Sequence, residues 1–184
     1  MKLIHNRKFA WGCLAVCIAV SIIGFGGGSL AAQRSDAVRI FNVGIDTSFA
    51  VPFSMDAYLE NCASYAEIMA QEYRLHVDKD SNSAASVLEV AQIIVNDDAI
   101  DNLSNSYKIL CRQIEDLYID FYAADVAESD RAIFKNAYSN FQGEVSKIKY
   151  DEYHAVAAKF NSAIEGFPAN AISRLLGIDA LSEF

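Results

Sequence analysis

The sequence predicts an all-α protein: an antiparallel bundle of three to four long helices preceded by one transmembrane helix. Only two prolines and nine glycines interrupt the 184 residues, and so few helix-breaking residues favour long helices. An uncharged run of 24 residues, from Phe9 to Ala32, exceeds the roughly 20 apolar residues that a helix needs to cross a bilayer. In the rest of the chain, apolar residues recur at intervals of three and four, the spacing of one helix face.

Charge divides the chain into a basic start and an acidic body. Lys2, Arg7 and Lys8 precede the uncharged run, and the residues after Lys8 carry 12 basic and 24 acidic side chains, a net charge of −12. An acidic body repels phosphate backbones and anionic lipid, so we expect no nucleic-acid partner. Because basic residues stay on the cytoplasmic side of a span, we expect the N-terminus in the cytoplasm and the body outside it.

The N-terminal segment, residues 1–32, has two main interpretations that stay open. It is either a membrane anchor or a cleaved signal peptide, since the triplet Ser29-Leu30-Ala31 has small residues at the two positions that a signal peptidase reads. A lipoprotein signal at Cys17 is a weaker third one, because Val16 stands where a small residue is expected. Gly24 and Gly28 have G-x-x-x-G spacing, but we interpret the glycine-rich end of the run as a flexible exit. Residues 33–184 are the predicted helical bundle domain.

The first helix should continue past the membrane, from Ala31 to Val43. The segment from Asp46 to Pro52 should interrupt it, because a proline disfavours helix at the preceding residue. Ser54 is the expected N-cap of the next helix, which has an amphipathic stripe. That stripe consists of Met55, Tyr58 or Leu59, Cys62, Tyr65 or Ala66, Met69 and Tyr73.

Two more helices are expected after a polar loop at residues 78–83. The segment 84–95 is apolar nearly all round, which predicts that it is buried. The segment 98–124 carries a heptad repeat, which predicts packing of the coiled-coil type. The repeat positions are Ile100, Leu103, Tyr107, Leu110, Ile114, Leu117 and Phe121.

The last long helix is predicted from a cap at Ser129 to Gly166. It has two apolar stripes that are offset by five residues, so the apolar face rotates between them. The first stripe is Phe134, Tyr138, Phe141, Val145 and Ile148, and the second is Tyr153, Ala157, Phe160, Ile164 and Phe167. Pro168 should end this helix, and a short helical segment, 169–176, should stop at Gly177.

The C-terminal residues from Tyr153 to Phe184 resemble the end of the bacterial LemA family. There a long helix carries YN, then V, then YN or FN, then I and FP-x-N, before a glycine-bearing turn and a terminal aromatic residue. The positions that fit are Phe160, Asn161, Ile164, Phe167, Pro168, Asn170, Gly177 and Phe184. The first YN pair of the family pattern is not matched, because Tyr153 is followed by His154. The stretch AQRSDAVRIFNVGID, from Ala32, is similar to a divergent form of the family's helix after the membrane.

This resemblance implies a single N-terminal span and a bundle of long helices, with no established reaction. We interpret the motif residues as structural, with a partner-binding surface as the alternative. Asn161 and Asn170 can bond backbone groups left free near the helix break. Phe167 should be buried, fastening the short terminal helix onto the bundle, while Pro168 fixes the turn.

No motif indicates a catalytic residue, a metal ligand set or a cofactor. We therefore predict a non-catalytic envelope protein that binds another protein. Its nine tyrosines could serve recognition, but at helical spacing we expect most of them to lie in the core. The alternative is an enzyme or metal-binding bundle that uses His76 and His154 with nearby carboxylates. Glu72 and Asp151 lie four and three residues before these histidines, but no second E-x-x-H motif of the di-metal bundles is present.

The four cysteines fall into two pairs. Cys13 and Cys17 lie inside the uncharged run, where they serve as small apolar residues. Cys62 and Cys111 lie in the body, where they are either joined by a disulfide or buried as free thiols on neighbouring helices.

Overall fold

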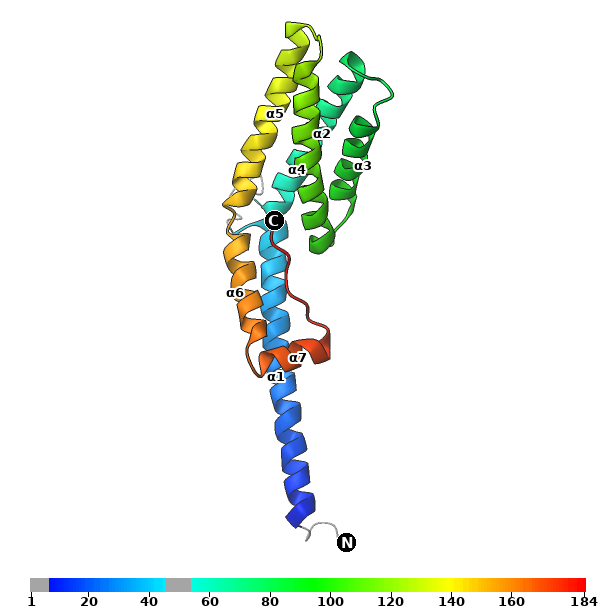
Figure 1. Cartoon of the computed structure of the whole chain (residues 1–184). Helices are drawn as coiled ribbons and strands as arrows, with labels where there is room; N and C mark the ends of the chain where they lie inside the picture. The colour runs from blue at the N-terminus through cyan, green and yellow to red at the C-terminus, as the bar shows by residue number, and fades with distance from the viewer. Residues whose placement is uncertain (1–6, 46–53) are drawn as a thin grey trace. The chain divides into compact units, whose positions relative to one another are not determined.

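The computed structural model describes residues 7–45 and 54–184, and this part of the chain contains seven α-helices and no strand (Figure 1). The helices are α1 (Arg7–Val43), α2 (Met55–His76), α3 (Asn82–Asn96), α4 (Ile100–Ala123), α5 (Glu128–Lys149), α6 (Tyr153–Glu165) and α7 (Ala169–Leu176). The chain forms two compact units. The first comprises α1 up to Val38 with Val156–Leu181, and the second comprises Arg39–Ala155 with Ser182–Phe184. The all-α prediction is confirmed.

The second unit is built on α2, α3, α4 and α5, in which successive helices run in opposite directions (Figure 1). Helix α2 packs against the other three. The heptad repeat of α4 is confirmed, because all its positions from Leu103 to Phe121 are buried. At one end of the core the ring of Phe121 stacks on that of Phe134 from α5, with centroids 3.9 Å apart.

Helix α2 begins and packs as its sequence predicts. Ser54 is the N-cap, and its hydroxyl accepts the backbone N–H of Ala57 at 3.2 Å. The stripe faces the core, and at the two ambiguous positions Leu59 and Ala66 are the buried residues. The predicted interruption from Asp46 to Pro52 lies outside the described residues. Before it, α1 ends at Val43.

The prediction that segment 84–95 is buried on all sides was wrong. Helix α3 packs against α2 and α4. Val87, Val90 and Ala91 are buried, whereas Ile93 and Val95 are exposed. The helix lies at the edge of the bundle, so its second apolar side has no helix of the second unit beside it.

The predicted single helix from Ser129 to Gly166 is two helices, α5 and α6. Ser129 is not its cap, because α5 begins one residue earlier at Glu128. The break follows from the offset between the two stripes: on a straight helix, five residues turn the face by about 140°. Interrupting the helix at residues 150–152 lets both Ile148 and Tyr153 be buried, and the Asp151 carboxylate accepts the Tyr153 N–H at 2.8 Å.

The first unit consists of most of α1 with α6 and α7. In α1, the side chains from Phe9 to Phe25 are largely exposed, although the segment is strongly apolar, with a mean hydropathy of 2.2 over its most apolar window. This is the one described helix that is long and apolar enough to cross a membrane. Helix α7 lies across α1 (Figure 1) and ends at Gly177, whose φ of 65° is left-handed.

Candidate interaction surfaces

The Asn161 side chain fastens the C-terminal segment within the first unit. Its Nδ2 donates to the Leu181 carbonyl, and its Oδ1 accepts the Leu181 N–H, each at 2.8 Å. A carboxamide that makes both bonds satisfies the backbone donor and the backbone acceptor of one residue, Leu181. Asn161 was predicted to bond backbone groups near the helix break. It does bond backbone groups, but they belong to Leu181, 20 residues further along the chain. Asn170 contributes its carbonyl, which accepts the Ser173 hydroxyl.

The last three residues are held within the second unit. The Tyr153 hydroxyl donates to the Ser182 carbonyl at 3.0 Å. The Glu183 carbonyl accepts from the Ser104 hydroxyl and from the Lys108 ammonium, both at 2.7 Å. These bonds hold the chain end against α4.

The Phe184 ring belongs to an aromatic cluster in the same unit. Its centroid lies 5.6 Å from that of Phe41 and 6.1 Å from those of Tyr107 and Tyr153. Tyr153 is fully buried and also meets Phe41 edge-on at 5.1 Å. The terminal aromatic residue of the motif therefore closes part of the core.

The prediction that Phe167 is buried was wrong, because its ring is 87% exposed. It was expected to continue the stripe of Phe160 and Ile164, but α6 ends at Glu165, so Phe167 leaves the helical phase of that stripe. Phe160 is buried and Ile164 is half-buried. Pro168 directly precedes α7, and Gly177 follows its last residue.

Gly26 and Gly27 form a contact that the sequence interpretation missed. A methyl group on Gly26 would lie 2.7 Å from Cδ1 of Ile172, and one on Gly27 would overlap Leu176. Both glycines lie inside the continuous helix α1 and face α7. This region is therefore helical and packed, and the prediction of a flexible exit was wrong. The G-x-x-x-G pair, Gly24 and Gly28, has nothing within 4 Å of such a methyl group.

The two body histidines lie in separate surroundings. His76, at the end of α2, pairs with Glu72 and with Asp130 of α5, each at 3.4 Å. The Nε2 atom of His154 is 2.9 Å from the Ile148 carbonyl, across the break between α5 and α6. Across residues 7–45 and 54–184, no three His, Cys, Asp or Glu side chains are placed to hold a metal ion.

Cys62 and Cys111 are free thiols in the core region between α2 and α4. Burial raises the pKa of both thiols. The Tyr107 hydroxyl bonds to the Cys111 sulfur, and burial likewise raises the pKa of Tyr107. Protonated thiols are poor nucleophiles, so this pair suits packing better than chemistry.

Tyrosines gather on the face shared by α4 and α5. The rings of Tyr118 and Tyr138 are stacked with centroids 4.0 Å apart, and Tyr122 lies 4.6 Å from Tyr118. The Tyr138 hydroxyl donates to the Glu115 carboxylate at 2.9 Å. All three rings are partly exposed, so this tyrosine face offers flat aromatic surfaces and hydroxyl groups together.

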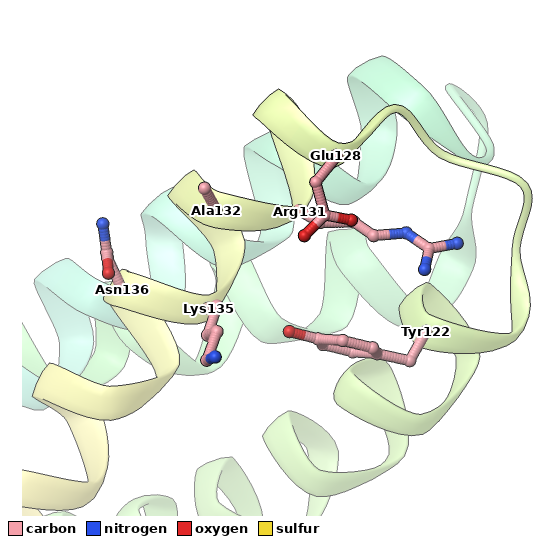
Figure 2. A pocket seen from close by; sticks show the side chains of 6 residues that line it. All are labelled: Tyr122, Glu128, Arg131, Ala132, Lys135 and Asn136. Atoms are coloured by element: carbon pink, nitrogen blue, oxygen red, sulfur yellow. The ribbon is translucent and has the colours of Figure 1, made fainter.

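A pocket of about 440 Å³ adjoins the tyrosine face (Figure 2). Figure 2 shows the Tyr122 ring below the Arg131 side chain, with Lys135 one turn further along α5. The Arg131 guanidinium donates to the Ala124 carbonyl at 3.0 Å and so fastens the loop between α4 and α5. Lined also by Glu128, Ala132 and Asn136, the pocket suits polar recognition.

Comparisons with known proteins add no relative: no family model, no curated protein and no solved structure matches this chain.

Proposed function

We propose that this chain is a non-catalytic envelope protein that is anchored by α1 and presents its helical bundle to another protein. The observation that carries the proposal is the exposure of α1: Trp11 is 68% exposed and Phe25 is 84% exposed, whereas the aromatic rings at the bundle centre are buried. A long apolar helix with uncovered side chains is stable when hydrocarbon replaces water around it.

The packing of α7 favours an anchor over a cleaved signal peptide. Cleavage near Ala31 would remove Gly26 and Gly27, which lie against Ile172 and Leu176. Ile172 is buried with α1 in place and would then face solvent. This contact supports the proposal that the segment is retained in the mature protein.

The tyrosine face of α4 and α5 is the proposed binding surface for the partner. Tyrosine is enriched at protein interfaces because one side chain offers an apolar ring and a hydrogen-bonding hydroxyl. Here Tyr118 stacks on Tyr138 and contacts the tilted ring of Tyr122, beside a polar pocket. Membership of the LemA family is part of the same proposal and rests on the C-terminal motif, in which Asn161 and Phe184 hold the chain end.

The anchor and its orientation are tested together in intact cells. An enzyme reporter that works only in the cytoplasm, fused after Phe184, should be inactive, because Arg7 and Lys8 keep the other end of α1 inside. The fusion should also stay in the membrane pellet after alkaline carbonate washing at the full-length mass. Reporter activity would refute the orientation, and release of a shortened chain would refute the anchor.

The partner surface is tested with a photoreactive phenylalanine analogue. Placed at Tyr122, the analogue should give a discrete crosslinked product in native membranes. Gln71 is exposed on α2 and serves as the matched control position, from which no such product is expected. Equal products from both positions would contradict a binding role for the tyrosine face.

A further inference from the structure

Helix α7 is amphipathic and keeps part of its apolar side uncovered. Ile172 is buried against Gly26 of α1. Leu176 contacts Gly27 and is 46% exposed, whereas Leu175 is 65% exposed and Phe167, just before the helix, is still more exposed. The close approach of α7 to α1 thus covers one row of side chains and leaves another row open.

An apolar groove of about 250 Å³ lies between the two helices. Ala19, Ile22 and Ile23 of α1 form one wall. Phe167, Ala171 and Leu175 contribute to the other, so the groove is lined by carbon. A water molecule in such a groove would find no hydrogen-bond partners on its walls. An acyl chain has no hydrogen-bonding groups, so it could fill the groove without that cost.

The position of the groove along α1 places it at the level of lipid. A helix rises 1.5 Å per residue and the hydrocarbon layer is roughly 30 Å thick, so a span that begins at Phe9 ends near Gly28. Ala19, Ile22 and Ile23 therefore belong to the part of the span that lies in the outer half of the hydrocarbon layer. Since α7 lies across α1 at Gly26 and Gly27, near the outer end of that span, it would run parallel to the membrane plane close to the boundary of the hydrocarbon layer (Figure 1).

The polar residues of α7 suit the boundary between hydrocarbon and headgroups. The Ser173 hydroxyl is buried and donates to the Asn170 carbonyl, so it needs no water. Arg174 is exposed, and its long side chain can reach lipid phosphates while its stem stays in apolar surroundings.

We propose that Phe167 and α7 form an interfacial foot in the outer leaflet, with a lipid acyl chain in the groove beside α1. This inference rests on the proposed anchor. It identifies the partner of Phe167 as lipid, and it accounts for an aromatic ring that is exposed beside a transmembrane segment. The foot would fix the depth of the span and tie the end of α6 to the membrane surface.

Fluorescence quenching by acyl-brominated phosphatidylcholine tests the proposal in vesicles that also contain phosphatidylglycerol. The native Trp11 reports on α1, and Phe167→Trp in a Trp11→Phe background reports on the foot. Ile119→Trp in the same background is the matched control, since Ile119 is 63% exposed on α4 of the bundle. We expect the Phe167→Trp chain to lose as much emission as the native chain and to emit at shorter wavelength than the Ile119→Trp chain, which should lose none.

Each other outcome overturns the proposal in a recognisable way. Long-wavelength emission without quenching from the Phe167→Trp chain would place this residue in water. Short-wavelength emission without quenching would mean that protein, such as a second copy, covers the groove. In both cases quenching of Trp11 would leave the anchor intact. If Trp11 itself is not quenched, the anchor fails, and the interfacial foot fails with it.

Discussion

The two units of this protein differ in how many of their large aromatic side chains they leave exposed. In the bundle unit, Phe121, Phe134 and Phe141 are buried between helices. In the unit of α1, α6 and α7, Trp11, Phe25 and Phe167 are largely exposed. Burying apolar area from water stabilises a fold by about 25 cal/mol per Å², but the same area gains nothing by leaving hydrocarbon. This difference is what the proposed anchor would produce around α1 and α7, whereas α6 in the same unit still buries Phe160.

The largest expected effect is that of Phe134→Ala compared with Phe167→Ala. Phe134 is fully buried and stacks on Phe121, so its truncation should lower the free energy of unfolding by about 3–5 kcal/mol. Phe167→Ala should change it by less than about 0.5 kcal/mol, as at other exposed positions. Thermal unfolding of the full chain in detergent, followed by circular dichroism, measures both changes.

A large loss for Phe167→Ala would show that its ring packs against protein. That result would remove the contrast between the two units and return Phe167 to the structural role that the sequence predicted. Phe160→Ala is an internal reference, because Phe160 lies in the same motif and is buried.

The second effect concerns the chain end. Asn161→Asp keeps the shape of the side chain but replaces its donor with an acceptor that faces the Leu181 carbonyl. We expect a loss of roughly 1–3 kcal/mol of stability, the cost of leaving such a group unsatisfied. Asn140→Asp, at an exposed position on α5, adds the same charge and is the control. Equal stability of the two variants would show that the bonds to Leu181 contribute nothing.

The structure also shows which of its features could be predicted from the sequence. The long apolar helix α1, the heptad of α4 and the Ser54 cap depend on residues close in the chain, so composition, periodicity and local chemistry predicted them. The break between α5 and α6 was also visible in the sequence. The two apolar stripes are offset by five residues, and a single straight helix could not have buried both. Periodicity groups side chains on a face without saying what covers that face, which is why Phe167 was assigned to the core.

The missed contacts involve residues that are distant in sequence. The bonds between Asn161 and Leu181 join a side chain to backbone across an irregular segment, which leaves no periodic signal. Gly26 and Gly27 differ from Gly28 only in what lies opposite them in the fold. No local sequence pattern distinguishes a glycine against which another helix packs closely from a glycine that faces open space.

The third effect is alkaline destabilisation of the bundle unit. Burial raises the pKa of Cys62, Cys111 and Tyr107, so the native state keeps protons that the unfolded chain releases. The stability that they contribute is complete below the ordinary pKa values, 9.0 for a thiol and 10.0 for a phenol, and is lost as pH rises above them. The melting temperature should fall increasingly above pH 9.0.

The contribution of one thiol can be separated by substitution. Cys62→Ala should lower the melting temperature at neutral pH, because it leaves a small cavity, but should make its decline above pH 9.0 shallower. A decline of unchanged steepness would mean that Cys62 ionises alike in the folded and unfolded states, against its burial.

The smallest expected effect separates Gly27 from Gly28 and tests the contact that holds α7. Gly27→Val places a side chain where Leu176 now lies, whereas Gly28→Val meets nothing within 4 Å at its Cβ. Both variants add the same apolar group to the span, so insertion into the membrane should be unaffected. Overpacking of about 1 kcal/mol at Gly27 should raise the detached population of α7 roughly fivefold. The rate of tryptic cleavage after Arg174 in vesicles measures that population, and equal rates for the two variants would mean that α7 does not depend on the glycine contact.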